Sequence, residues 1–97
     1  MPSALVSVII PVYSHEGYVQ ETLKSIIEQT FQSIELIVLN DGSKDNSHQK
    51  VVEIREACEQ RFVNFVYVDK ENEGIIKTLN RGLELASASL RLYYSLR

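Results

Sequence analysis

Three short polar segments, each placed after an apolar run, carry the side chains of this sequence that could do chemistry. Asp41 ends the run LIVLN and is followed by Gly42. A carboxylate accepts a charge-assisted hydrogen bond from an imide N–H between two carbonyls, and the edge of uracil offers such a group. The segments 11–16 (PVYSHE) and 69–74 (DKENEG) add an aromatic ring, acids and amides. Together they indicate nucleobase recognition, whereas turn chemistry is the alternative interpretation of NDGS.

Five further residues could contribute to ligand binding. Four of them also have an ordinary structural interpretation, and Pro11 acts on the backbone. Pro11 fixes the backbone, and Tyr13 could stack on a planar ring or pack in the core. Glu16 could accept hydrogen bonds from sugar hydroxyls, or could serve as an acid in the first turn of a helix. Lys77 and Arg81 could meet phosphate charge if their helix begins near the same crevice; otherwise they lie on a solvated face.

The histidines and the single cysteine favour no catalytic or metal site. His15 and His48 lack acidic or cysteine partners at ligand spacing, so we expect both to be solvated. Cys58 falls on an apolar stripe and is expected to be structural. A lone cysteine excludes an internal disulfide and a cysteine-based zinc site, and it suits a reducing compartment.

Three familiar phosphate and nucleotide motifs are missing from the sequence. No Gly-x-Gly-x-x-Gly follows the first apolar run, which argues against a dinucleotide site. No Gly-Lys-Ser/Thr phosphate loop occurs. A phosphoaspartyl-transferase would need an aspartate two places before Asp41, and that position is Leu39.

Length and composition bound the class of protein. The 97 residues suit a single domain, 1–97, and an apolar share of 44% is ordinary for a globular chain. A net charge of -3 without clustered Lys and Arg argues against a nucleic-acid partner. The apolar run ALVSVIIPV is too short to span a bilayer. We therefore expect a cytoplasmic domain, with any membrane association arising from segments outside this sequence.

Apolar periodicity predicts an alternation of strands and helices, with stripes that include Ile75 and Ile76 on the third helix. Asp45 or Ser47 is the expected cap of the second helix, and Asn72 that of the third. The alternation predicts a three-layer α/β/α fold with a mostly parallel sheet, strand order 3-2-1-4, and a ligand crevice beyond the carboxyl ends of the strands. The expected strands cover residues 4–10, 34–40, 62–68 and 90–96; the expected helices cover residues 16–30, 46–60 and 74–87.

Three segments, VSVIIPVYSHEGYVQETLKSIIEQT, ELIVLNDGSKDNS and ENEGIIKTLNRGLELA, closely resemble the inverting family 2-type glycosyltransferases of GT-A fold. The resemblance covers residues 5–86. It implies a nucleotide-sugar donor, most often a UDP-sugar, a saccharide or lipid-linked acceptor, and Mg²⁺ or Mn²⁺. It also implies that Pro11, Tyr13 and Glu16 frame the base and ribose. Asp41 would contact the uracil, and residues 72–80, which include Lys77, would help to close the donor site.

Two small departures from the family pattern lie in the matching segments. The family often has Asp-Asp where this chain has Asn40 and Asp41, so the second, base-reading position is kept. The family also often has Asn at the position of Ser14.

A larger departure falls near the end of the chain. The family follows its third helix with Gly, a short apolar strand and an Asp-x-Asp motif that binds the metal ion. Aligned without gaps, the Gly position is Ala88, and the two Asp positions are Ser95 and Arg97. Arg91 would stand in a strand that should be central and buried, where an unpaired charge is costly.

These observations predict the N-terminal, nucleotide-sugar-binding part of an inverting glycosyltransferase, without its metal motif, catalytic base or acceptor part. No catalytic residue is assigned, and we expect the 97 residues alone to be inactive and to bind no metal ion tightly. The alternative is a non-catalytic nucleotide-binding or interaction module derived from that fold. An uncovered sheet edge predicts a homodimer through residues 88–97, against a monomer with a disordered tail.

Overall fold

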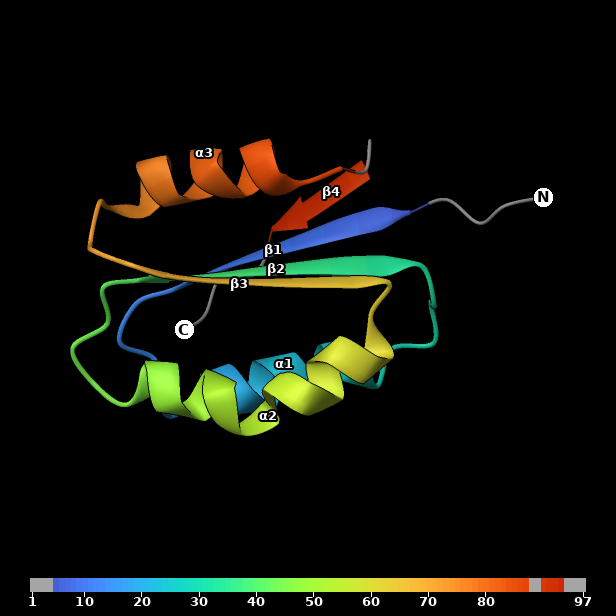
Figure 1. Ribbon diagram of the computed structural model, residues 1–97, viewed down its shortest axis with the longest axis horizontal. Helices are drawn as coiled ribbons and strands as arrows, with labels where there is room; N and C mark the ends of the chain where they lie inside the picture. Colours follow the sequence, from blue (N-terminus) through green and yellow to red (C-terminus); the bar gives the residue numbers. More distant parts are fainter. Residues whose placement is uncertain (1–4, 88–89, 94–97) are drawn as a thin grey trace.

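The computed structural model describes residues 5–87 and 90–93, which form alternating strands and helices (Figure 1). This alternation is the one that the apolar periodicity predicts. The elements are β1 (Val6–Val12), α1 (Val19–Ile27), β2 (Ile34–Asp41), α2 (Ser47–Arg61), β3 (Asn64–Lys70), α3 (Ile75–Leu85) and β4 (Leu90–Tyr93).

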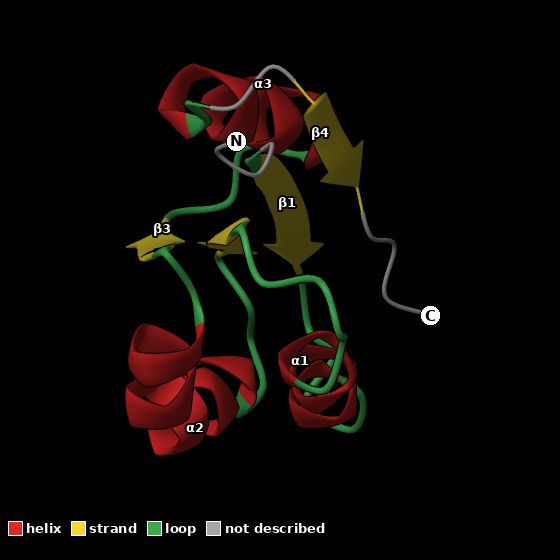
Figure 2. Ribbon diagram, turned by 90° about the vertical axis from the view of Figure 1, so that its right-hand side faces the viewer, coloured by secondary structure: helices red, strands yellow, loops and turns green. Residues whose placement is uncertain are grey.

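The four strands form one parallel sheet in the order β3-β2-β1-β4, so the predicted α/β class and strand order are confirmed. The chain builds the sheet from β1 toward β3 and then reverses to place β4 on the other side of β1. Helices α1 and α2 cover one face, and α3 covers the opposite face (Figures 1 and 2). The reversal puts a switch point between β1 and β4, where α/β sheets bind ligands.

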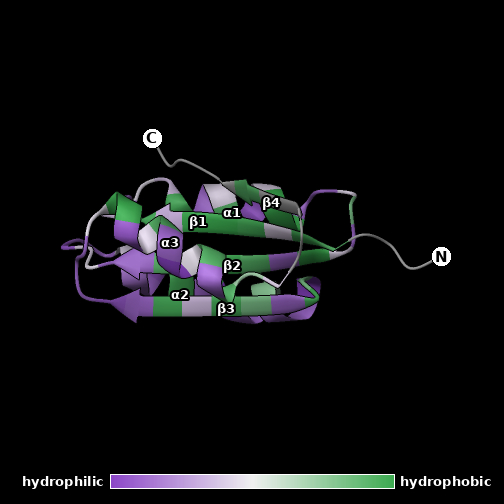
Figure 3. Ribbon diagram, turned by 90° about the horizontal axis from the view of Figure 1, so that it is seen from above, coloured by the Kyte–Doolittle hydropathy of each residue, from purple (hydrophilic) through white to green (hydrophobic). Residues whose placement is uncertain are grey.

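Alternate residues of the central strands supply two separate apolar cores. Val8 and Ile10 of β1 pack toward α1 and α2, whereas Ile9 of β1 and Leu39 of β2 pack toward α3. Because both faces are covered, the strands are apolar along much of their length, as Figure 3 shows for β1 and β2. Each such buried side chain contributes roughly 1.5–3 kcal/mol relative to its exposed state.

Several predicted boundaries shift by a few residues. Pro11 lies inside β1, whereas the sequence predicts that it ends this strand. Proline is tolerated there because β4 pairs with β1 only from Val6 to Ile9, so Pro11 has a described neighbouring strand on one side alone. A turn closed by the Tyr18 N–H on the His15 carbonyl (2.9 Å) delays α1 to Val19.

Helix α3 corrects the predicted apolar stripe at its first turn. Leu79 and Leu83 pack on the sheet as predicted. Ile75 and Ile76 were expected to point inward as well, but their side chains are 54% and 70% exposed. Both side chains lie in the first turn of α3, at the carboxyl-end edge of the sheet, where Ile75 and Pro11 line an open cleft. Farther along, a Cβ at Gly82 would lie 2.5 Å from Ile9 Cγ2, so glycine permits the close approach of α3 to β1.

The helix caps also differ in part from those predicted. The N-cap of α3 is Gly74, with a φ of 92°, and not Asn72. Asn72 instead donates its side-chain N–H to the Asp41 carbonyl (3.0 Å). At α2 the N-cap is Asn46, and neither Asp45 nor Ser47 as predicted, although Asp45 Oδ1 accepts the backbone N–H of Ser47 just before the helix (2.9 Å).

The described part of the fourth strand is short. β4 covers the first part of the predicted strand 90–96 and includes Arg91 in its backbone. Ala88, Ser95 and Arg97 lie outside the described residues, so the homodimer through residues 88–97 stays a prediction. In the described part of the chain, no helix is long and apolar enough to cross a membrane.

Candidate functional site

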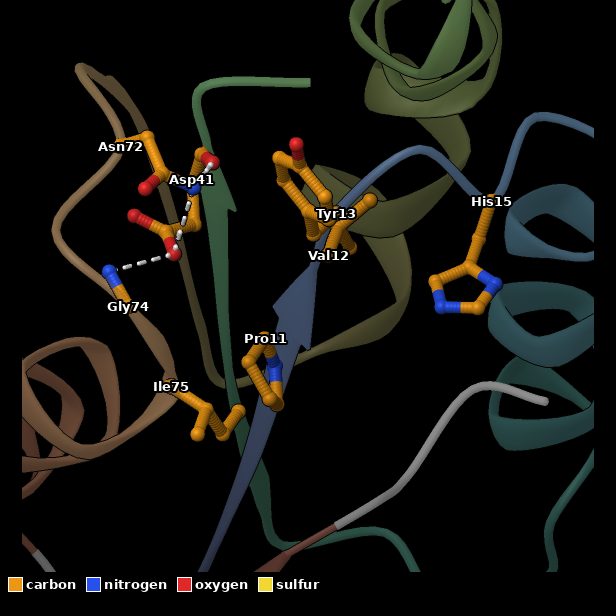
Figure 4. A pocket seen from close by; sticks show the side chains of 8 residues that line it. All are labelled: Pro11, Val12, Tyr13, His15, Asp41, Asn72, Gly74 and Ile75. Carbon is orange, nitrogen blue, oxygen red and sulfur yellow. Dashed lines mark hydrogen bonds between the residues drawn. The ribbon is translucent and has the colours of Figure 1, made fainter. Parts of the chain in front are cut away.

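A cleft of about 420 Å³ opens at the carboxyl ends of β1 and β2, beside the first turn of α3. Figure 4 shows Asp41, Asn72 and Gly74 on one side of the end of β1 and His15 on the other, with Pro11 and Ile75 facing each other below. The cleft is lined by Pro11, Val12, Tyr13, His15, Asp41, Asn72, Gly74 and Ile75.

The Asp41 carboxylate is the most constrained polar group of this cleft. Its Oδ1 accepts hydrogen bonds from Lys70 Nζ (2.7 Å) and from the backbone N–H of Glu73 (2.7 Å). Its Oδ2 accepts one from the backbone N–H of Gly74 (3.1 Å) and a longer one from the Asn72 amide (3.4 Å). The two oxygens therefore differ: Oδ1 has two short bonds, and Oδ2 has one short and one long bond.

Electrostatics keep Asp41 charged although its side chain is only 6% exposed. Burial by itself would raise the pKa of this carboxyl, but hydrogen bonds from Lys70 and the Glu73 N–H outweigh burial and hold the pKa below its ordinary value of 3.8. Lys70 is 9% exposed, so the two charges form a nearly buried ion pair. The buried Thr78 hydroxyl has no hydrogen-bond partner within the described chain, but it lies near enough to favour the charged carboxylate.

Glycine is required directly after Asp41. Gly42 has a φ of 66°, a left-handed conformation that costs other residues energy. A Cβ at Gly42 would lie 2.5 Å from the backbone nitrogen of Asn72. The loop after β3 can therefore pass closely over the end of β2 and bring its N–H groups to the Asp41 carboxylate.

The loops after β1 and β2 hold each other through side-chain to backbone hydrogen bonds. The N–H of Ser14 donates to Ser43 Oγ (2.9 Å), and the N–H of Lys44 donates to Ser14 Oγ (3.2 Å). Ser14 has a φ of 51°, in the left-handed region where Asn is tolerated better than Ser. This conformation explains why Asn suits the position in the resembling family, and it fixes the direction in which Tyr13 leaves β1.

Asn40 donates two hydrogen bonds on the opposite face of the sheet that an aspartate could not donate. Its amide donates to Asp69 Oδ1 (3.1 Å) and to the Tyr67 hydroxyl (3.3 Å), and its Oδ1 accepts a hydrogen bond from Ser43. A carboxylate at this position would face the Asp69 carboxylate without a proton between them. Asn40, which stands where the family often has aspartate, therefore suits the neighbouring Asp69 of this chain.

His48 is exposed, as expected for a solvated histidine, but it has polar neighbours that the sequence did not indicate. Its Nδ1 lies 2.8 Å from the Tyr67 hydroxyl and 3.4 Å from Asp69 Oδ2. The His48 and Tyr67 rings stack with centroids 5.7 Å apart. Burial raises the pKa of the Tyr67 hydroxyl to about 12, so it remains protonated.

Cys58 is buried as predicted, and burial raises the pKa of its thiol to about 11.

The structure brings some of the predicted site residues together and leaves others apart. Pro11, Tyr13 and Asp41 line the same cleft. Glu16 lies outside it, in a second depression along α1, and its backbone N–H donates to Asp45 Oδ2 (3.1 Å). Lys77 is exposed on α3 and is not among the lining residues.

Sequence analysis missed Lys70, His15 and Ile75 as residues at or beside the cleft. A signal existed for Lys70, because Asp41 and Lys70 end neighbouring strands and pair in register. Opposite charges at two adjacent strand ends are a pattern that can be searched for. Ile75 and His15 carried no comparable signal. Their positions depend on where α3 begins and on how the β1 loop bends.

Metal ligands are not assembled in the described part of the chain. Residues 5–87 and 90–93 contain no group of three or more His, Cys, Asp or Glu side chains that could hold a metal ion. The metal positions implied by the family resemblance align with Ser95 and Arg97, outside those ranges.

A parallel sheet with a cleft at its switch point is typical of the class of α/β domains that bind ligands at the carboxyl ends of their strands. Comparison with known proteins narrows this class. The chain belongs to glycosyl transferase family 2, whose model matches residues 7–93.

Curated relatives carry glycosyltransferase names. The chain is 38% identical over 84 residues to glycosyltransferase GlyA of Streptococcus pneumoniae, covering 87% of this chain and 12% of that protein. It is 40% identical over 82 residues to the minor teichoic acid biosynthesis protein GgaB of Bacillus subtilis, covering 82% of this chain and 9% of that protein. The chain thus spans only a small part of these relatives.

Solved structures share the GT-A fold. TarS 1–349 of S. aureus in complex with UDP is similar with a TM-score of 0.80 and 29% identity, covering 95% of this chain and 27% of TarS 1–349. A mannosyltransferase of Pyrobaculum calidifontis in complex with GDP-Man and Mn²⁺ gives a TM-score of 0.79 and 26% identity, covering 89% of this chain and 25% of that one. These neighbours bind different nucleotides on one fold.

Proposed function

We propose that this chain is the nucleotide-sugar-binding part of an inverting glycosyltransferase that uses a UDP-sugar donor. The carrying observation is Asp41, a charged and nearly buried carboxylate that lines the cleft at the switch point. Family membership and the UDP-bound TarS neighbour support the same donor class.

The two Asp41 oxygens accept hydrogen bonds of different lengths, and this difference supports uracil over guanine as the bound base. Uracil presents a single N–H, which could replace the long Asn72 contact at Oδ2 while the short bonds of Oδ1 remain. Guanine presents two adjacent N–H groups on one edge, and a carboxylate binds both best with its two oxygens. Oδ1 is already occupied by Lys70 and the Glu73 N–H, so guanine would have to displace a short bond.

The rest of the cleft would position the base and ribose. Tyr13 supplies an exposed aromatic face, and Pro11 with Ile75 supplies apolar walls. Ring stacking and exclusion of water would strengthen the hydrogen bond to Asp41. These side chains bind and orient the donor. None of the described residues is assigned to proton transfer.

Transfer itself would need residues beyond this chain. In a complete inverting enzyme a carboxylate base removes the proton of an acceptor hydroxyl on a saccharide or lipid-linked acceptor, and this hydroxyl attacks the anomeric carbon. The chemistry that Mg²⁺ or Mn²⁺ would supply in such an enzyme is charge stabilisation of the diphosphate leaving group. The described residues do not assemble a site for such an ion.

The lack of assembled metal ligands in the described residues favours the second candidate, a nucleotide-binding module without catalytic activity. Both candidates predict UDP binding. They differ in whether transfer occurs when the chain is part of a longer protein with an Asp-x-Asp motif and an acceptor part. Transfer of sugar by the purified 97 residues would contradict the second candidate and the expected inactivity of the isolated chain.

Calorimetric titration of UDP and GDP, each with and without Mn²⁺, tests the proposed donor. We expect UDP to bind at least roughly tenfold more tightly than GDP, because GDP must break a short bond at Asp41. Mn²⁺ is expected to change the UDP affinity little. Equal affinities for UDP and GDP would contradict the uracil assignment, and failure of both to bind would contradict nucleotide binding altogether.

A further inference from the structure

The cleft has little positive charge for the diphosphate of a nucleotide. Lys70 lies next to it but is paired with Asp41. Lys77, which the sequence suggested for phosphate, is exposed and does not line the cleft. Among the lining residues of the described chain, His15 is the side chain that can carry a positive charge.

His15 is held in place by its backbone, while its ring remains available. Its N–H donates to Ser47 Oγ (2.9 Å), and its carbonyl accepts the N–H groups of Tyr18 (2.9 Å) and Val19 (3.0 Å). The imidazole packs edge-on against the Tyr18 ring with centroids 6.4 Å apart. Within the described residues no hydrogen-bond partner is found for either ring nitrogen. A fixed backbone with a free donor ring is suited to meet a ligand.

The location of His15 relative to Asp41 matches the layout of a nucleotide. Asp41 ends β2, whereas His15 leaves β1 on the other side, and Figure 4 shows Pro11 and Tyr13 between the two. That side of β1 faces β4, so His15 lies at the switch point where the strand order reverses. A nucleotide with its base edge on Asp41 and its ring beside Tyr13 would extend its phosphates toward His15.

We propose that the His15 imidazole donates a hydrogen bond to the diphosphate of the donor whose base binds at Asp41. The inference rests on the proposed function, since it assumes a nucleotide in this cleft. A neutral imidazole offers one N–H and an imidazolium offers two, and a charge-assisted bond to phosphate is stronger than a neutral one. His15 is thereby a specificity residue for the phosphates and not for the base.

A series of ligands with zero, one and two phosphates tests this role, with the second histidine as the matched control. Uridine, UMP and UDP are titrated into the parent chain, His15→Phe and His48→Phe, with affinities taken from NMR shift changes that reach millimolar dissociation constants. Phenylalanine keeps a ring against Tyr18 but removes both nitrogens. We expect His15→Phe to lower UDP affinity roughly tenfold and to leave uridine affinity at the parent value. His48→Phe is expected to match the parent for every ligand.

The ring signals give a second readout, because the chain has only two histidines. UDP is expected to shift the His15 ring signals in the parent, and uridine is not. His15→Leu, which also removes both ring nitrogens, serves if His15→Phe does not fold.

The outcomes separate the two proposals. If the parent binds neither uridine nor UDP, the proposed function fails. If the parent binds UDP and neither His15 variant weakens it, the phosphate role of His15 alone is overturned. Equal weakening of uridine and UDP would make His15 a packing residue and would overturn the role as well.

Discussion

Strand β2 carries a buried carboxylate near each end, and the two have different surroundings. Glu35 near the start is 2% exposed and accepts hydrogen bonds from Ser7 Oγ (2.7 Å), the Asn64 amide (3.0 Å) and both the N–H (2.9 Å) and Oγ (3.0 Å) of Ser87. Asp41 at the other end accepts its bonds from an ammonium group, an amide and two backbone N–H groups. Glu35 has only neutral donors, and Asp41 has a cation.

The difference teaches that a buried, ionised carboxylate does not by itself mark a binding site. In both residues burial would raise the pKa, but hydrogen bonds outweigh it and lower the pKa, led by the Ser87 N–H at Glu35 and by Lys70 at Asp41. Glu35 fixes the link from α3 to the sheet and does not line the cleft at the carboxyl ends of the strands. Asp41 also fixes a loop, but its carboxylate lines a cleft that a ligand can enter. Access to a ligand distinguishes the two.

Acidification is expected to have the largest effect, because it discharges both carboxylates at once. Each pKa is lower in the folded chain than its ordinary value of 4.5 for Glu35 or 3.8 for Asp41, so the unfolded chain binds protons more readily. The stabilisation is complete above those ordinary values and is lost as pH falls through the folded pKa values. Urea unfolding between pH 7 and pH 3 measures this loss. A Glu35→Gln chain with the same pH dependence as the parent would show that Glu35 is not held charged.

Glu35→Ala is expected to reduce the free energy of unfolding by about 3 kcal/mol, because four hydrogen bonds to a buried, charged carboxylate are lost together. UDP affinity of the folded protein should stay at the parent value, since Glu35 lies at the far end of the strand. Urea unfolding and UDP titration provide the two measurements. Glu84→Ala, an exposed glutamate on α3, is the control and should change stability little. Loss of UDP affinity in folded Glu35→Ala would break the comparison.

Asp41→Asn is expected to lower UDP affinity tenfold to a hundredfold, or roughly 1.5–3 kcal/mol, because an amide replaces the acceptor of the base N–H. Stability should also fall, since Lys70 loses its charged partner. Calorimetric titration of folded protein measures the first effect separately from the second. Equal UDP affinity in variant and parent would leave Asp41 with only the structural role that Glu35 has.

Asn40→Asp is expected to cost about 1–2 kcal/mol of stability, because it removes a hydrogen bond and sets a second carboxylate beside Asp69. The half-exposed position of Asp69 keeps this cost moderate. The double variant Asn40→Asp with Asp69→Asn restores one donor and one acceptor and should recover most of the loss. Thermal unfolding of the three chains decides. A single variant as stable as the parent would show that the Asn40 contacts do not matter.

The sheet could be predicted because its signals are local. Apolar runs and helical periodicity define strands and helices without reference to distant residues, and right-handed crossovers then limit the strand order. The carboxyl-end cleft followed from that order, and so did the placement of Asp41 in it. Pro11 and Tyr13 reached the same cleft because they follow directly from β1.

The contacts that distinguish the two carboxylates could not be predicted in this way. Glu35 meets Ser87 across 52 positions of the sequence, and Asp41 meets Lys70 across 29. Such pairs depend on the register between strands and on where α3 begins. The same dependence left Ile75 and Ile76 wrongly assigned to the core, since periodicity gives the face of a helix but not which of its turns are covered by other residues.

Backbone amide signals on the two carboxylates offer the most direct test of the central claim, that Asp41 is the ligand-binding carboxylate of β2 and Glu35 is not. The N–H of Gly74 donates to Asp41, and the N–H of Ser87 donates to Glu35, so each reports on its own carboxylate. In a ¹H–¹⁵N titration with UDP, we expect the Gly74 signal to shift in the parent and not in Asp41→Asn. The Ser87 signal should stay in place in both. Saturable UDP binding that leaves Gly74 unchanged, or that shifts Ser87 as strongly, would contradict the account.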